Sequence, residues 1–216
     1  TTGDGREFTR DDWLWLHGAY PSANAPAIDG KLQEWESRSA AWLFYDYGWG
    51  MNRHLMQLDE GGENFGYPPY TIDGRAAFWT SYDKTNLYLA IRLQDDQAVL
   101  ENDNGEKVVV NIQSESGKHS HIRIFPDTKG GGMASLMSGF DRTVLKPKSS
   151  VTVNGPTTIG IELAIPWAVL DVTPATGSLV RFDLLYTDVD RANGKLVRGT
   201  LRWAGGASKS GYMWLR

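Results

Sequence analysis

Acidic residues gather in one short stretch that follows a run of alternating apolar residues. Its members are Asp95, Asp96, Glu101 and Asp103, and Asn102 and Asn104 lie among them. Carboxylate and carbonyl oxygens are the ligands that Ca²⁺ prefers, and six or more oxygens from such a loop could hold this ion. A solvated acidic loop is the competing interpretation. We therefore expect these four acids to form any metal site, with calcium as the ion and no organic cofactor.

A second candidate site lies in a long irregular stretch. Residues 41–70 are rich in glycine, proline and aromatic side chains, and their second half lacks a clean period. Long loops in compact domains are often functional. The apolar face of a pyranose packs on an aromatic ring, while its hydroxyl groups bond to polar side chains. The stretch therefore predicts sugar contact through Trp49, Tyr67 and Tyr70, with a packed loop that binds no ligand as the alternative.

The histidines give a weaker signal. His119 and His121 alternate along one predicted strand, so their side chains share a face. Such a pair could bind a transition metal, or hold haem together with a distal Met. No third ligand stands at a useful spacing, and a polar pair on an edge strand is the favoured interpretation. The sequence also lacks Gly-x-Ser-x-Gly, P-loop and His-Glu-x-x-His motifs, so no common catalytic class is indicated.

Short strands separated by turn signals must position these groups. Residues 76–82 and 87–93 flank a short polar turn and predict a hairpin. A helical turn is expected at 166–170, with Pro at its start. The pattern predicts an all-β fold, a single antiparallel β-sandwich of immunoglobulin-like or jelly-roll-like two-sheet architecture with a long aromatic-rich loop. The other predicted strands are 107–113, 120–125, 141–145, 150–153, 158–165, 180–188, 196–203 and 212–216.

Composition narrows the class of protein. The chain has 216 residues, of which 41% are hydrophobic, and its formal net charge is −4. We expect one domain over 1–216, with 1–26 as an N-terminal extension and with Trp35, Trp79 and Trp167 in the core. The weak negative charge argues against nucleic acid and anionic membranes as partners. No 18-residue apolar run is present, so no membrane-spanning helix is expected. The oligomeric state stays open.

Two further features bear on the compartment. The chain contains no cysteine, which excludes disulfides, thiolate metal sites and cysteine nucleophiles. It opens on Thr1 rather than Met, which is typical of a trimmed start from which a signal peptide has been removed. Both features fit our expectation of an exported bacterial protein.

Four segments together resemble a known family. They are 27–30 with Trp35, 82–91 with Asp95 and Asp96, 161–167, and 194–203 with 214–215. In this order and at these spacings they resemble the family 9 carbohydrate-binding modules and their DOMON-like relatives, over most of the chain from Ala27 onward. The resemblance implies a β-sandwich that stacks sugars between aromatic rings, often with calcium near its loops. DOMON-like relatives bind sugars or haem.

The resemblance also suggests ligand residues. Arg123 matches the family's hydrogen-bonding arginine, and Tyr212 or Trp214 matches its second stacking ring, but no Trp stands near 101–103, where the first is expected. We therefore expect non-catalytic glycan binding, serving a polysaccharide-degrading system in a secreted or periplasmic location. The alternative is a haem-binding DOMON-like redox subunit, or a glycan-active hydrolase or lyase on the same fold. The expected ligand-binding residues are Trp49, Tyr67, Tyr70, Arg123, Tyr212 and Trp214.

Overall fold

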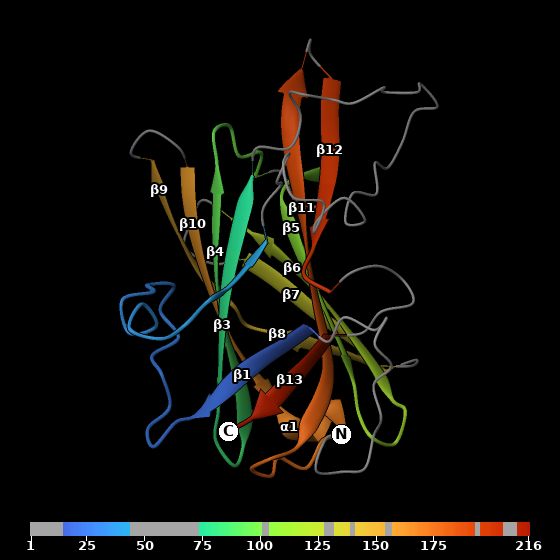
Figure 1. Cartoon of the computed structure of the whole chain (residues 1–216). Coiled ribbons are helices and arrows are strands. Elements are labelled where there is room, and N and C mark those ends of the chain that lie inside the picture. Colours follow the sequence, from blue (N-terminus) through green and yellow to red (C-terminus); the bar gives the residue numbers. More distant parts are fainter. Residues whose placement is uncertain are drawn as a thin grey trace.

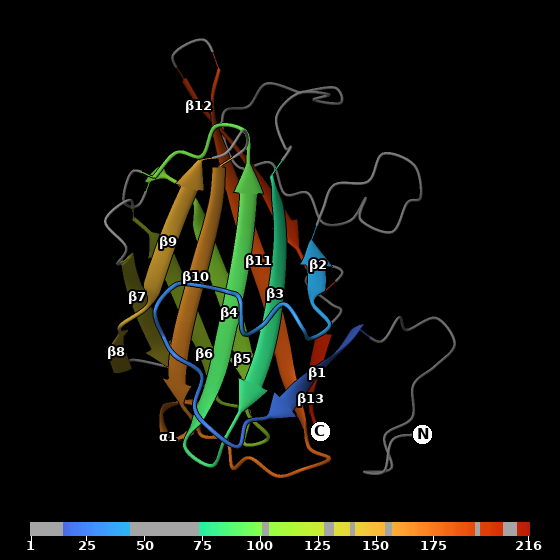
Figure 2. The same cartoon turned by 90° about the vertical axis from the view of Figure 1, so that its left-hand side faces the viewer.

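A computed structural model shows two layers of β-strands packed face to face (Figures 1 and 2). It describes residues 15–43, 74–100, 104–127, 132–138, 141–153, 157–192, 195–204 and 211–216. None of the helices it describes is long and apolar enough to span a membrane. In chain order the elements are β1 (Trp15–Pro21), β2 (Ala41–Leu43), β3 (Arg75–Tyr82), β4 (Asn86–Asp95), β5 (Lys107–Gln113), β6 (His119–Pro126), β7 (Gly132–Ser138), β8 (Asp141–Leu145), β9 (Lys148–Val153), β10 (Thr157–Pro166), α1 (Trp167–Leu170), β11 (Leu179–Ala192), β12 (Lys195–Arg202) and β13 (Gly211–Leu215).

Hydrogen bonds link the strands in the order β8-β7-β6-β5-β11-β13-β1-β3-β4-β10-β9. We name the first half, from β8 to β13 with β12, the β5 layer. The second half, from β3 to β9 with β2, is the β4 layer. Figure 2 shows the β4 layer in front and the β5 layer behind it. Most pairs are antiparallel, as the sequence predicts.

Strand β1 joins the two layers at one end of the sandwich. It pairs in parallel with β13 through Trp15–Ala19 and then with β3 through Tyr20 and Pro21. This strand lies within residues 1–26, the range that the sequence sets apart as an extension. The described part of that range is therefore a strand of the sheet.

Alternating strands supply the core between the layers. Strand β5 alternates buried and half-buried residues along its whole length, with Val108, Val110 and Ile112 pointing inward. Aromatic rings close the core beside β1, where the rings of Phe78 and Trp203 meet edge to face at 5.4 Å between centroids. This period-two pattern is the reason that the strand positions could be predicted from sequence.

The two layers differ on their outer faces. Residues 22–43 run across the outside of the β4 layer (Figure 2), and there a second buried cluster forms. Trp35 and Trp79 are its largest members, and Leu32, Tyr88 and Ala90 pack with them. Strand β3 is consequently buried on both faces. The outer faces of β5 and β6 carry half-buried and exposed residues instead. Among the described residues, the outer face of the β5 layer is therefore the more exposed of the two.

The buried carboxylate of Glu162 holds the covering segment in place. One of its oxygens accepts hydrogen bonds from the backbone N–H groups of Asp29 and Gly30, at 2.9 and 2.7 Å. The other accepts a hydrogen bond from the indole N–H of Trp35 at 2.7 Å. Burial raises the pKa of Glu162, and these three donors oppose that shift. Two separate sequence segments, 27–35 and 161–167, are thus joined by one side chain.

Most predicted elements are confirmed, and β1, β2 and β7 are absent from the predicted strands. The hairpin of 76–82 and 87–93 is β3 and β4, with Tyr82 opposite Leu87. Trp35, Trp79 and Trp167 are buried as expected. Strand β7 begins at Gly132, the third of three consecutive glycines, and β2 lies at the start of the irregular stretch. A three-residue strand carries too few alternating positions to stand out in a sequence.

We predict that Glu162→Ala strongly destabilises the protein. The variant leaves three N–H donors without their acceptor in a buried site, and we expect a loss of about 3–5 kcal/mol in the free energy of unfolding. Urea denaturation measures this change. Glu34→Ala is the control, because Glu34 is exposed and accepts only the N–H of Ala27. Similar losses in both variants would contradict the role given to Glu162.

His17 makes the stability pH-dependent. It is buried against Phe78 and Trp203, and burial, followed by the charge of Arg216, lowers its pKa from 6.5 to about 4. Between these two values the unfolded chain binds a proton that the folded protein does not. The stability should therefore fall by about 3 kcal/mol as the pH drops through this window.

We predict that His17→Leu removes this part of the pH dependence. Leucine has a similar volume and no proton to bind, so its stability curve should be flatter between pH 6.5 and 4 than that of the parent. Denaturation at a series of pH values compares the two slopes, while the titration of all other groups is common to both proteins. Parallel curves would show that His17 is not protonated differently in the two states.

Candidate functional site

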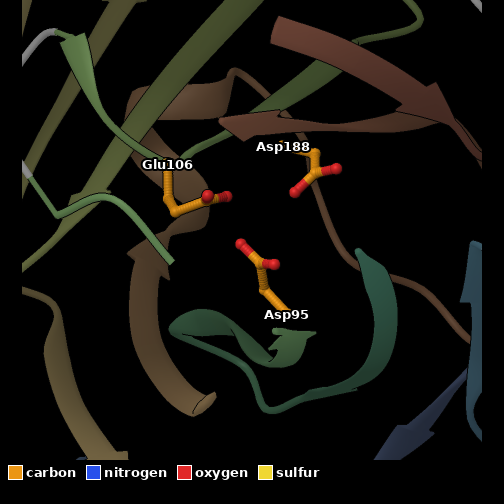
Figure 3. A group of neighbouring side chains, drawn as sticks. All are labelled: Asp95, Glu106 and Asp188. Atoms are coloured by element: carbon orange, nitrogen blue, oxygen red, sulfur yellow. The ribbon is translucent and has the colours of Figure 1, made fainter. Parts of the chain in front are cut away.

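Three buried carboxylates converge between the layers at the end away from α1. Asp95 ends β4, Glu106 directly precedes β5, and Asp188 lies on β11. One oxygen from each lies within 4.8 Å of the other two, and Figure 3 shows the three groups pointing toward one another. Asp95 is 2% exposed, Glu106 is 1% exposed and Asp188 is fully buried. The β4 layer supplies one acid and the β5 layer two, so the group spans the sandwich.

Two oxygens of this group lack hydrogen-bond partners among the described residues. Asp95 Oδ1 accepts the N–H of Gln97 at 3.1 Å, and Glu106 Oε1 accepts the N–H of Val189 at 3.0 Å. Asp95 Oδ2 and Glu106 Oε2 are buried and accept nothing. A buried, unsatisfied acceptor is costly. The site therefore has acceptor capacity that the described chain does not fill.

The electrostatics of the group favour a positive ligand. Burial raises the pKa of Glu106 to about 10, and the charge of Asp188 adds to this effect. The hydroxyl of Tyr186 donates to Asp188 at 3.4 Å, and its own pKa is raised by burial and by these acids. Three carboxylates this close repel one another unless a proton or a cation lies between them. Oxygen ligands of this kind suit a hard cation such as Ca²⁺.

The metal ligands predicted from the sequence overlap with this group in part. Asp95 belongs to it, and Asp95 also forms a second group with Asp96 and Asp190. Glu101 and Asp103 lie outside the described residues. Glu106, Asp188 and Asp190 were not among the predicted ligands. Asp188 and Asp190 lie on β11, which forms a hairpin with β12. Acids two residues apart on a strand share one face, and a carboxylate that faces the core of a sandwich needs a partner, so this spacing was the available signal.

The outer face of the β5 layer holds the described ligand candidates. Tyr212 of β13 lies directly opposite Arg181 of β11, which in turn lies opposite Gln113 of β5. These three side chains, with Glu115 of the β5–β6 turn, line a groove of about 230 Å³. Trp214, two residues farther along β13, is 38% exposed on the same face. Aromatic, guanidinium, amide and carboxylate groups are thus brought together in one place.

Arg123 lies on the same face, within a row of hydrogen-bonded side chains. Its Nε–H donates to His121 Nε2 at 3.2 Å, and His121 Nδ1 lies 2.7 Å from Asn111 Oδ1. Burial, together with the charge of Arg123, lowers the pKa of His121. A neutral imidazole that accepts at Nε2 carries its proton on Nδ1 and donates it to Asn111. Both ring nitrogens of His121 therefore have partners.

The predicted ligand residues do not form one compact site. Arg123 and Tyr212 are separated by three strand spacings and by four residues along the strands, which amounts to about 19 Å. A single sugar cannot reach both. The remaining candidates, Trp49, Tyr67 and Tyr70, lie outside the described residues.

No family model matches this chain, and no curated protein sequence matches it. Solved structures do. A family 9 carbohydrate-binding module from Caldicellulosiruptor kristjanssonii in complex with cellotriose aligns over 93% of this chain and 95% of its own, with 13% identity and a TM-score of 0.54. A family 9 carbohydrate-binding module from the same organism in complex with glucose gives 12% identity and a TM-score of 0.52, over 93% of this chain and 96% of its own. A proposed carbohydrate-binding protein from Bacteroides uniformis gives 11% identity and a TM-score of 0.60, over 94% and 99%.

These identities are low, and the coverage is nearly complete on both sides. The likeness therefore concerns the arrangement of the whole sandwich rather than particular side chains. The predicted resemblance to the family 9 modules is confirmed at the level of the fold: the chain has the β-sandwich of a family 9 carbohydrate-binding module.

Proposed function

We propose that this protein binds carbohydrate on the outer face of the β5 layer. The observation that carries the proposal is the groove lined by Gln113, Arg181 and Tyr212, with the exposed ring of Trp214 beside it. A ring that a pyranose can contact and polar groups that can bond to hydroxyls are the two components of a sugar site. The solved neighbours, which hold cellotriose and glucose, support the same class of ligand.

The position of Arg123 suggests that the length of the bound oligosaccharide affects its affinity. A ligand in the groove must extend about 19 Å along the face to meet Arg123. We expect Arg123 to contact longer oligosaccharides and to leave short ones unaffected. Binding to extracellular polysaccharide implies an exported protein and fits a role in polysaccharide degradation, without a catalytic step of its own.

We predict that Trp214→Ala weakens glycan binding about tenfold. Contact with one exposed ring contributes on the order of 1–3 kcal/mol, by analogy with stacking of nucleic acid bases on aromatic side chains, and about 1.4 kcal/mol corresponds to a factor of ten. Calorimetric titration with a panel of soluble neutral and acidic oligosaccharides, cellotriose included, measures the change.

Trp42→Ala is the matched control for this experiment. Trp42 is 49% exposed on β2, in the other layer, so its loss should leave affinity unchanged. Arg123→Ala should weaken binding of long oligosaccharides only. Equal affinity of the parent and Trp214→Ala would exclude this part of the face as the site, and a parent that binds no member of the panel would overturn the proposed function.

We further propose that the cluster of Asp95, Glu106 and Asp188 binds Ca²⁺ as a structural ion. The support is the convergence of three buried carboxylates with two unfilled acceptor oxygens. The ion would link the two layers, since its ligands come from both. Asp96 and Asp190 extend the acidic group toward solvent and give the cation a route of entry.

We predict that a chelator lowers the melting temperature of the protein and that excess Ca²⁺ restores it. A ligand that binds only the folded state stabilises it by about 2.7 kcal/mol at a hundred times its dissociation constant. Glu106→Gln replaces one carboxyl group of the cluster by an amide at nearly constant shape. The amide cannot supply the negative charge of a carboxylate ligand, so the melting temperature of this variant should respond less to Ca²⁺ than that of the parent.

Asp171→Asn serves as the control, since Asp171 is exposed and distant from the cluster in the chain. Its left-handed backbone, with φ of 56°, also tolerates asparagine. This variant should respond to Ca²⁺ as the parent does. A parent whose melting temperature is the same with chelator and with Ca²⁺ would show that the acids hold no ion.

A further inference from the structure

A guanidinium group lies over two aromatic rings on the outer face of the β5 layer, near the proposed sugar groove. Arg216 lies over the ring of Trp214 at 5.3 Å and over the ring of Tyr20 at 4.8 Å. Its Nη1 donates to the hydroxyl of Tyr20 at 3.1 Å. Gly18 lies opposite Trp214 on β1, and a Cβ atom there would come within 2.5 Å of Arg216 Nε. The absent side chain of Gly18 thus makes room for Arg216.

A second guanidinium lies in the groove itself. Arg181 is exposed and donates from Nη1 to Gln113 Oε1 at 3.1 Å. Arg181 lies opposite Tyr212, and Arg216 is four residues farther along the same strand direction, so the Cα atoms of the two arginines are about 14 Å apart on one face.

Neither cation has an acidic partner within the described residues. Elsewhere in the structure, arginines in comparable positions do. Arg92 lies over the ring of Trp79 at 5.4 Å and pairs with Glu36, and Arg202 pairs with Asp183. Glu115 lines the groove with Arg181 and forms no ion pair with it. Two arginines on one face, both without an acidic partner among the described residues, are unexpected in a chain whose net charge is −4.

We propose that the glycan bound here is anionic, with carboxylate or sulfate groups that pair with Arg216 and Arg181. This inference rests on the proposed function and specifies its ligand. A guanidinium held by two rings and one hydrogen bond loses little freedom on binding, and its remaining N–H groups match the two oxygens of a carboxylate. Because the Arg216 guanidinium carbon lies 5.3 Å from the centroid of the Trp214 ring, its charge is next to the ring that a sugar would contact. A uronic acid is the simplest sugar with such a group.

A pair of ligands with the same skeleton tests the role of charge. Calorimetric titration compares oligogalacturonate with its fully methyl-esterified form, which has lost the charges only. We expect the acid to bind at least about tenfold more tightly and the difference to shrink with added salt. Sulfated oligosaccharides form a third arm that distinguishes sulfate from carboxylate as the preferred group.

Variants locate the effect on this face. Arg216→Gln should weaken binding of the acid about tenfold and leave the weak binding of the ester nearly unchanged. Arg181→Gln removes a residue of the groove itself, so it should weaken binding of both ligands, and that of the acid more than that of the ester. Arg92→Gln is the matched control, since Arg92 also lies on a tryptophan ring but is on the other layer and is paired. It should bind the acid as the parent does.

The possible results separate the two proposals. Equal affinity for acid and ester, or full affinity in Arg216→Gln, overturns the inference and leaves carbohydrate binding intact. Tight binding of neutral oligosaccharides alone does the same. Equally tight binding of single-stranded DNA would also overturn the inference, because charge alone would then suffice. If no oligosaccharide of any class binds, the proposed function itself fails.

Discussion

The difference between the covered β4 layer and the open β5 layer depends on the Glu162 carboxylate. A buried carboxylate without donors is unstable, and here three N–H groups of residues 29–35 supply them. Once these bonds form, Trp35 lies on Trp79 and the outer face of the β4 layer is closed. Close packing supports this arrangement, since a Cβ atom on Gly160 would come within 2.5 Å of the carbonyl oxygen of Gly30. The β4 layer is thereby buried on its outer face as well as on the face toward the core.

The covering of one face determines where a ligand can bind. A sandwich of this size has two outer faces, and residues 22–43 cover the outside of the β4 layer. On the β5 layer, polar side chains alternate outward from β5, β6 and β11, and β13 adds an exposed tryptophan. The covered β4 layer therefore serves stability, and the β5 layer is the face on which we propose that ligands are recognised. Side chains on the β5 face can change with little effect on the core, which is compatible with a fold shared at 11–13% identity.

The sequence predicted the fold better than the site, for a physical reason. Alternation and turn chemistry act locally, and they identified most strands. Three of the four motif segments also proved to be contact partners. Glu162 meets 27–35, and the backbone around Asp83 accepts a hydrogen bond from the indole N–H of Trp167 at 2.9 Å. A single sequence shows only that such segments occur together in one chain, and it does not show that their residues are in contact. The acidic group needed Asp188 beside Glu106, which are far apart in the chain, and spacing alone cannot reveal that contact.

The two proposed sites occupy opposite ends of the sandwich, and this separates their roles. Asp188 lies seven residues from Arg181 along β11, or about 23 Å. No direct contact between a cation at one end and a glycan at the other is possible. The layers are joined near the groove by β1, through its pairs with β13 and β3, and at the other end the carboxylates of both layers face each other across the core. A cation bound there would replace repulsion between the carboxylates with attraction, at an end where no described strand crosses between the layers. Its effect on a sugar ligand would therefore act through the stability of the whole sandwich.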